Sequence, residues 1–356
     1  MSKNSGQNGR SISLVAVGDI YIKRDDPASI MAKVKPYIRK VDIALANQES
    51  SISDRGTRMT MRLGMRSKPG TEAVLPDTGF HAVGLSNNHT MDFGPEGLLQ
   101  TVENLDRVGI AHAGAGRNFE EAHQPALITK KGVTVALLSY TSVFQPLYAA
   151  KPDSPGIAVV QVTAAYEPDV RAVDMPGVPP RVLTYPNQND VQALVQDIKK
   201  AKAQADIVVI SWHWGISAGF RTYVNYQFEL GHAAIDAGAD LIFGHHAHYP
   251  LGIEVYKGKA IFYDMSNFAM ELGKTHTTVA VSMMLRCEIS GKKIKKVSFL
   301  PVAIDPSGAP DILDTQRGAH VVQLIQQLSE RFGTRFSVKP DEVVVQTSPA
   351  VKGSQS

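Results

Sequence analysis

The chain is poor in cysteine, in net charge and in long apolar runs, and each shortage excludes a class of protein. Its one cysteine, Cys287, excludes an internal disulfide and any zinc site built on thiolates. A net charge of only +3 over 356 residues argues against a nucleic-acid-binding surface, which needs clustered Lys and Arg. No apolar stretch approaches the roughly 20 residues that span a bilayer, and residues 1–10 are polar, unlike a secretion signal. We therefore expect a cytoplasmic protein with no membrane or nucleic-acid partner.

The composition is that of an ordinary globular protein, with 43% hydrophobic and 20% charged residues. Short apolar runs rich in β-branched residues are typical of strands that are covered on both faces. These runs cover residues 13–17, 43–46, 82–85, 133–139, 207–211, 241–243 and 260–263. Between them, residues 95–109 and 228–238 have the spacing and the terminal Pro or Gly of helices. Strands that alternate with helices predict a layered α/β fold.

Two regions depart from this alternation. Residues 141–190 hold eight of the 20 prolines, so we expect an irregular insertion, which either covers a binding site or is only a surface loop. In residues 306–345 the apolar spacing from Val321 to Leu328 predicts a helical extension. Residues 346–356 are small and polar and are expected to form a flexible tail. The main domain should therefore span residues 11–305.

Polar side chains follow almost every one of the apolar runs. They are Asp19, Asn47 and Glu49, Asn87, Asn88 and His89, His213, and the cluster of His245, His246 and His248. In parallel α/β sheets the carboxyl ends of the strands line one edge, where ligands bind. We therefore expect these side chains to meet in one volume.

Carboxylates and imidazoles together suit a divalent transition metal such as Mn, Fe or Zn. The candidates outnumber the three protein ligands of a typical mononuclear catalytic site, so two ions that share a bridging carboxylate become plausible. A metal pair generates hydroxide near neutral pH and stabilises the oxygens of the group under attack. The pattern therefore predicts a metal-dependent hydrolase that cleaves a phosphoester or an amide, with metal-bound hydroxide as the nucleophile.

The order and spacing of the motifs resemble those of one known family. The motifs are Gly18-Asp19, Asn47-Gln48-Glu49, Ser86-Asn87-Asn88-His89 with Asp92 and Gly94, His213-Trp214-Gly215, and Gly244-His245-His246-Ala247-His248. Over about residues 11–305 the chain resembles the CapA-type proteins, which act in poly-γ-glutamate capsule biosynthesis and belong to the calcineurin-like metallophosphatase superfamily.

The resemblance implies a four-layer α-β-β-α sandwich and a role for each motif. Asp19 would bind one metal and Glu49 would bridge both. Asn88 and His213 would bind the second. The run 245–248 has one histidine more than the family's closing His-x-His motif, so which of His245, His246 and His248 bind metal stays open.

The same resemblance implies that His89 donates a proton to the leaving group and that Asp92 holds it. Tyr21 stands where the superfamily commonly has a histidine. Whether one or two ions bind therefore stays open.

The resemblance implies a γ-glutamyl-type or other small-molecule substrate, and the arginines near the motifs favour an anionic one. Arg62 and Arg66 lie in a stretch, 57–68, that is either an edge strand with a solvated face or a clamp for a carboxylate or phosphate. The remaining candidate substrate contacts are Arg221, Tyr223, Asn47 and Asn87.

The competing function is an accessory protein that binds the polymer without turnover. A nuclease is disfavoured by the small net charge. The sequence does not decide whether the chain forms a homo-oligomer.

Overall fold

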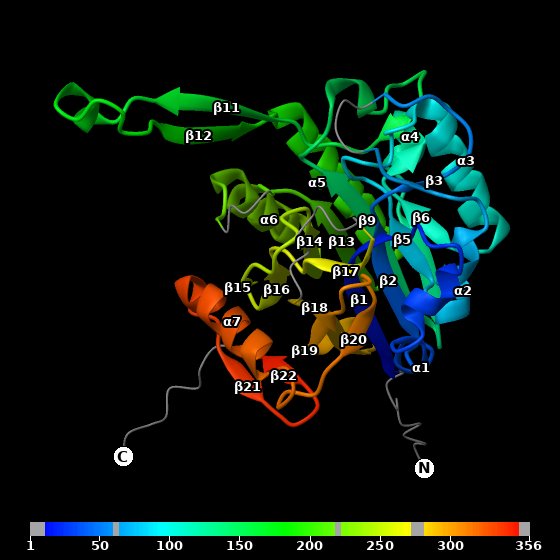
Figure 1. Ribbon diagram of the computed structural model, residues 1–356. Helices are drawn as coiled ribbons and strands as arrows, with labels where there is room; N and C mark the ends of the chain where they lie inside the picture. Colours follow the sequence, from blue (N-terminus) through cyan, green and yellow to red (C-terminus); the bar gives the residue numbers. More distant parts are fainter. Residues whose placement is uncertain (1–10, 60–63, 218–221, 272–280, 349–356) are drawn as a thin grey trace, which may run out of the picture.

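The computed structural model describes residues 11–59, 64–217, 222–271 and 281–348. Two β-sheets face each other and helices lie on their outer sides (Figure 1). Within the described ranges no helix has the length and the apolar character needed to cross a membrane.

The first sheet is built around β1, a long buried strand. Its strands follow the order β21-β22-β19-β18-β1-β2-β5-β6, with β17 also paired to β1 and β20 to β19. The bounds are β1 Ser11–Tyr21, β2 Ile43–Gln48, β5 Ala82–Gly84, β6 Ala111–Ala113, β17 Asn267–Met270, β18 Val281–Ser290, β19 Lys293–Ile304, β20 Pro310–Ile312, β21 Phe336–Val338 and β22 Val343–Val345. Strands β1, β2, β5 and β6 are parallel, so their carboxyl ends lie at one edge.

The second sheet follows the order β15-β16-β14-β13-β9-β8. Its bounds are β8 Ala126–Lys130, β9 Val133–Thr141, β13 Ile207–His213, β14 Leu241–His245, β15 Ile253–Tyr256 and β16 Lys259–Phe262. The four inner strands are parallel, and antiparallel β8 and β15 close the edges. All seven apolar runs of the sequence are therefore strands, as predicted.

Alternate residues of the central strands pack into different cores, which is how two sheets become four layers. Leu14 of β1 and Val209 of β13 meet in the core between the sheets. Val15, next to Leu14, faces outward into a core with Leu98 of a helix. Ile210 faces outward on the opposite side into a third core, which other helices cover. The expected α-β-β-α sandwich is confirmed.

Residues that favour helix ends stand at the boundaries of two long helices, an asparagine cap before one of them and a glycine after the other. They are α1 Lys35–Ile38, α2 Val74–Thr78, α3 Gly94–Arg107, α4 Phe119–Ala122, α5 Gln188–Gln204, α6 Asn225–Ala237 and α7 Ala319–Ser329. The side chain of Asn187 caps α5 by accepting from the N–H groups of Asn189 and Asp190. Helix α6 ends at Gly238, whose φ of 123° few other residues adopt. Helix α3 covers the first sheet, and α5 and α6 cover the second.

The C-terminal segment is more than the helical extension that we expected. Helix α7 is present, and its Val321 and Ile325 enter the core between the sheets. However, β20, β21 and β22 pair with the first sheet through β19. Residues 306–345 therefore complete the sandwich instead of lying beside it. In the tail, the N–H of Gln346 bonds to the Arg335 carbonyl, and residues 349–356 lie outside the described ranges.

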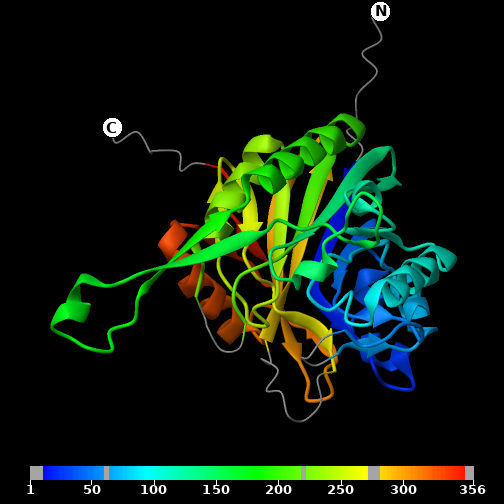
Figure 2. The same cartoon turned by 90° about the horizontal axis from the view of Figure 1, so that it is seen from above.

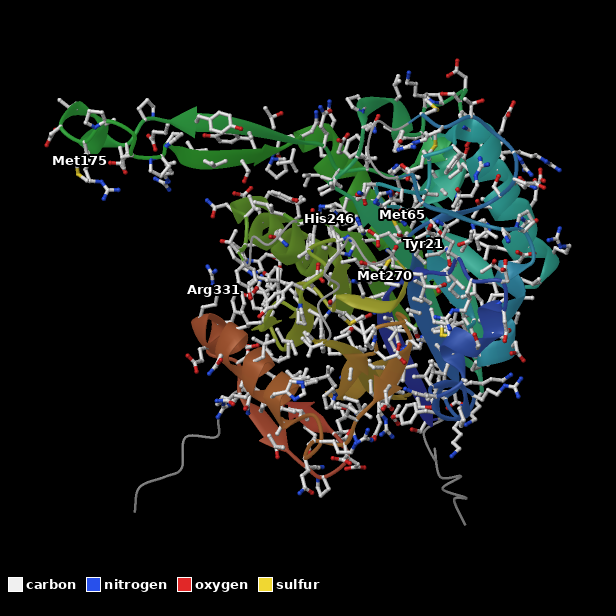
Figure 3. The ribbon with its side chains drawn as sticks, viewed as in Figure 1. Tyr21, Met65, Met175, His246, Met270 and Arg331 are labelled. Atoms are coloured by element: carbon white, nitrogen blue, oxygen red, sulfur yellow. The ribbon has the colours of Figure 1, made fainter. Side chains whose placement is uncertain are left out.

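The proline-rich insertion is more ordered than an irregular loop. Its first part packs on the body through the short helix η3 (Pro146–Tyr148) and through β10 (Gly156–Ile157), which pairs with β7 (Ala115–Gly116). Its second part is a hairpin of β11 (Val162–Glu167) and β12 (Arg181–Pro186) that projects from the body (Figures 1 and 2). Figure 3 shows Met175 at the outer end of this hairpin and His246 within the body of the molecule.

Candidate metal centre

The polar side chains that follow the strands meet where the two sheets present their carboxyl ends. Asp19 lies near the end of β1, and Glu49 follows β2 directly. His213 ends β13, and the run 246–248 follows β14. Asp19, Glu49 and His213 are fully buried, and His246 is almost so. The convergence expected from the sequence is therefore present in the fold.

One group of possible ligands is Glu49, His213 and His246, whose ligand atoms all lie within 4.8 Å of one another. The Nε2 atom of His213 lies 3.4 Å from Glu49 Oε1 and 3.0 Å from His246 Nδ1. Asn88 Oδ1 lies 2.6 Å from the same Nε2 atom. One imidazole nitrogen carries at most one proton and cannot satisfy three neighbours at once. A cation between these atoms could.

A second group consists of Asp19, Glu49 and His248, again with ligand atoms within 4.8 Å of one another. His248 Nδ1 lies 3.8 Å from Asp19 Oδ2, and its Nε2 lies 3.8 Å from Glu49 Oε1. Asn47 donates its amide to Asp19 Oδ1 at 2.6 Å, which fixes that carboxylate. The two groups share Glu49, which is the arrangement that a bridging carboxylate requires.

The charges of this centre are not balanced by the protein alone. Asp19 Oδ2 and both carboxylate oxygens of Glu49 are buried without a hydrogen-bond partner. Burial raises the pKa of both carboxyls well above the usual range, and the charge of Glu49 raises that of Asp19 further. Burial, and then the neighbouring histidines, lowers the pKa of His213. Buried carboxylates beside neutral imidazoles form a donor set that fits divalent cations.

The third histidine, His245, belongs to neither group. Its Nε2 lies 3.1 Å from Ser211 Oγ, and its Nδ1 lies 3.4 Å from Asp19 Oδ1. Burial lowers the pKa of His245 to about 3, so the ring stays neutral. The Nδ1 atom of His245 therefore lies beside Asp19 without a hydrogen bond, while His246 and His248 are the histidines that the geometry places around Glu49.

The loop that carries His246 and His248 is strained and is held by Asp264. His246 and His248 have φ angles of 100° and 54°, which side chains rarely adopt. Asp264, fully buried, accepts the Ala247 N–H at 2.7 Å and the Ser266 N–H at 2.6 Å. Asn267 Oδ1 lies 2.7 Å from His248 Nδ1 and orients that ring.

Sequence reasoning missed Asp264 and the orienting role of Asn267. Asp264 lies just after the end of strand β16, as Glu49 lies just after β2. This position after an apolar run was the signal in the sequence that could have identified it. Gly18 is also required: a Cβ there would lie 1.8 Å from the Ser266 carbonyl oxygen, so this close approach of two strand ends excludes any side chain.

The proposed proton donor is held as the resemblance implied. His89 Nδ1 lies 2.7 Å from Asp92 Oδ2, and the His89 side chain is 12% exposed. Asp92 itself is buried. His89 lies close enough to His213 for its charge to lower the pKa of that ring. The dyad therefore borders the metal-binding groups and retains some access to solvent.

Asn87 and Arg66, two of the residues expected to contact the substrate, bond to neighbouring parts of the protein itself. Asn87 is buried and caps its own turn, accepting from the N–H groups of His89 and Thr90. Arg66 stacks on the ring of Phe93 at 3.4 Å and bonds to the Arg55 carbonyl. Its guanidinium therefore stabilises the loop.

Tyr223 lies in an aromatic cluster with Phe228 and Tyr263. Its hydroxyl donates to the Leu328 carbonyl and accepts from the Gly252 N–H. These bonds indicate a packing role. Arg62 and Arg221 lie outside the described residues.

Tyr21, at the position where the superfamily commonly has a histidine, belongs to neither group of possible metal ligands. Its side chain packs with Met65 and Met270, and the Arg66 main chain bonds to its hydroxyl (Figure 3). The group with Asp19 therefore has one ligand fewer than the sequence pattern of the superfamily would provide.

Comparison with known proteins agrees with these motifs. Over 256 residues the chain is 30% identical to the PGA biosynthesis protein CapA of Bacillus subtilis, covering 70% of this chain and 58% of that protein. It is 26% identical to the capsule biosynthesis protein CapA of Bacillus anthracis, covering 95% of this chain and 78% of the relative. It is 27% identical to a probable polyglutamine synthesis accessory protein of Mycobacterium tuberculosis, covering 85% and 76%.

The chain thus spans less than two thirds of the Bacillus subtilis relative and about three quarters of the other two. The family model described as bacterial capsule synthesis protein PGA_cap matches residues 13–271, which include every proposed metal ligand. The CapA-type family expected from the motifs is confirmed, and the chain belongs to the PGA_cap family of bacterial capsule synthesis proteins.

Proposed function

We propose that this protein is a hydrolase that depends on divalent metal ions, with two ions bound side by side. The observation that carries the proposal is the pair of ligand groups that share Glu49. Glu49 has both carboxylate oxygens buried and unpartnered, so it is available to two cations at once. A structural site would be closed by thiolates or by four tightly packed ligands, and this centre instead borders a partly exposed histidine, His89.

Divalent ions bound there would lower the pKa of a coordinated water and would stabilise negative charge on the substrate oxygens. The residues of the chain supply the rest. Asn47 holds Asp19 through a hydrogen bond, and Asn267 orients the ring of His248. Asp264 holds the loop that carries His246 and His248 by accepting the Ala247 N–H. His89, with Nδ1 bonded to Asp92, keeps Nε2 for the leaving group and donates a proton to it.

The substrate is an anionic molecule with a γ-glutamyl amide or a phosphoester bond. The relatives are named for polyglutamate or capsule synthesis, which favours the amide. The fold's metal chemistry serves either bond, because both transition states develop charge on oxygen atoms that cations stabilise.

The competing role is binding of the polymer without cleavage, which the accessory name of the mycobacterial relative favours. That role requires the same anion-binding centre but no proton donor. The hydrogen bond between His89 and Asp92, which orients a proton donor, supports turnover instead.

The test is a screen of γ-glutamyl amides, a short poly-γ-glutamate and phosphomonoesters and phosphodiesters, with Mn²⁺ or Zn²⁺ added. We expect turnover in one class that stops on chelation and in Asp19→Asn. Glu254→Gln is the control, because Glu254 pairs with His232 and belongs to neither ligand group. Turnover that survives chelation would refute the metal mechanism. Polymer binding without any turnover would favour the accessory role.

A further inference from the structure

A buried tyrosine of the proline-rich insertion contacts the His89–Asp92 dyad. Tyr148, at the end of η3, is fully buried, although its neighbour Leu147 is 66% exposed. The Tyr148 hydroxyl donates to Asp92 Oδ1 at 3.3 Å. The two residues are 56 positions apart in the chain. Through Tyr148 the insertion therefore reaches the proposed proton-donor dyad.

The carboxylate of Asp92 receives donors from three segments of the chain. Oδ2 accepts the Met65 N–H at 2.9 Å and lies 2.7 Å from His89 Nδ1. Oδ1 accepts the Tyr148 hydroxyl. Because Oδ2 is used twice, the bond from Tyr148 to the other oxygen sets the rotation of the carboxylate about its own axis. That rotation determines where the imidazole of His89 points.

We propose that Tyr148 is a positioning residue: through Asp92 it holds the His89 ring in the orientation that delivers a proton to the leaving group. The inference rests on the proposed hydrolase function. It assigns part of the insertion to the active centre, while the projecting hairpin of β11 and β12 takes no part. A misplaced proton donor costs rate without changing metal binding, because neither Tyr148 nor Asp92 belongs to the two ligand groups.

The molecule contains a second arrangement of the same type, which serves as a control. The Tyr140 hydroxyl donates to Asp197 Oδ2 at 3.0 Å, and His123 Nδ1 lies 2.6 Å from the same oxygen. Tyr140 is buried, as Tyr148 is. It packs in the core on the outer side of the second sheet. Tyr140→Phe therefore removes an equivalent buried hydroxyl that does not contact Asp92.

The experiment compares the wild type, Tyr148→Phe and Tyr140→Phe on paired substrates that differ only in the leaving group. One substrate of each pair, a phosphoester or a γ-glutamyl ester, releases p-nitrophenolate, which leaves as a stable anion, and the other releases an alkoxide that needs a proton. We expect Tyr148→Phe to lower kcat on the poor leaving group by roughly ten- to a hundred-fold. We expect kcat on the good leaving group to fall less than about three-fold, with unchanged KM and metal content. Tyr140→Phe should lower neither.

Asp92→Asn is the second variant, and the protein with both Tyr148→Phe and Asp92→Asn completes a double-mutant cycle. If Tyr148 acts through Asp92, Tyr148→Phe adds little to the loss already caused by Asp92→Asn. Equal losses on both leaving groups, or additive losses in the double variant, would overturn the inference.

A second readout needs no turnover. In the zinc-loaded protein, ¹⁵N-edited NMR should show the His89 Nδ1–H proton that bonds to Asp92, and this signal should be lost or strongly shifted in Tyr148→Phe. An unchanged signal would overturn the positioning role. A wild type that shows this signal but cleaves nothing would refute the proposed function alone.

Discussion

The carboxylates of Asp19 and Glu49 lie side by side, both fully buried, with ligand atoms within 4.8 Å of each other and of His248. Within the described ranges, the basic side chains that lie within 4 Å of these two carboxylates are all histidines. Burial raises the pKa of each carboxyl, and burial lowers the pKa of His213. Without cations the centre therefore carries an uncompensated desolvation cost, of several kcal/mol per ion in typical proteins. Divalent ions bound between these groups would offset that cost.

The three neighbouring histidines should differ in their effect on metal content. We expect His246→Ala and His248→Ala each to lose about one ion per chain, because each belongs to one of the two groups that share Glu49. His245→Ala should keep both ions, since His245 lies outside both groups and its ring bonds to Ser211. Elemental analysis after gel filtration measures this, with His232→Ala as control. A larger loss in His245→Ala than in His246→Ala would contradict the assignment.

His89→Asn should impair turnover but not metal binding. Losing a positioned proton donor typically lowers kcat by roughly 10²- to 10⁴-fold, and His89 belongs to neither ligand group. Steady-state kinetics together with the metal content of the same sample test this. His123→Asn removes another histidine that bonds to a buried aspartate, Asp197, and should leave kcat unchanged. A His89→Asn protein with full activity would remove this residue from the mechanism.

Asp264→Asn should weaken metal binding although Asp264 belongs to neither ligand group. The substitution replaces an oxygen that accepts from Ala247 or Ser266 with an NH₂ group, so the strained backbone at His246 and His248 loses support. Loss of such a supporting bond typically weakens metal affinity by roughly ten- to a hundred-fold. Calorimetric titration with Mn²⁺ measures it. An affinity equal to that of the wild type, in a protein of unchanged thermal stability, would refute this role.

Glu342 should make stability depend on pH. Burial opposes its ionisation, but bonds from Lys296 at 2.9 Å and Ser298 at 2.8 Å outweigh that effect and lower its pKa below the ordinary 4.5. Because the folded pKa is lower than the unfolded one, this stabilisation is present above about pH 4.5 and is lost as the pH falls through the folded pKa.

Glu342→Gln should therefore lower the free energy of unfolding by about 1–3 kcal/mol at pH 7. The difference from the wild type should shrink below pH 4. Urea unfolding at a series of pH values measures it. A difference that stays constant down to pH 3 would contradict the role of the carboxylate.

The sandwich could be predicted from the sequence because its central strands are short, apolar and buried on both faces. Each run, such as residues 207–211, leaves few alternatives to a buried parallel strand. The C-terminal strands were missed because β20, β21 and β22 have three residues each, too few for a periodic signal. The hairpin of β11 and β12 was missed because prolines in its neighbourhood suggested irregular structure.

The convergence of the candidate metal ligands could be predicted because they lie at or after strand ends, where the topology alone brings them together. The roles of Arg66 and Tyr223 could not, since the sequence does not show that one stacks on Phe93 or that the other bonds to Leu328. Tyr148 was likewise hidden, because a contact over 56 positions leaves no local pattern. Local signals thus located the centre, whereas its supporting contacts depend on tertiary packing.

The number of divalent ions bound by the wild type and by Glu49→Gln, after loading with Mn²⁺ and gel filtration, tests the central claim most directly. Because Glu49 belongs to both ligand groups, we expect two ions per chain in the wild type and fewer than one in the variant. Glu254→Gln, whose side chain pairs with His232, should keep two. A wild type that binds no ion, or a Glu49→Gln protein that keeps both, would contradict the account.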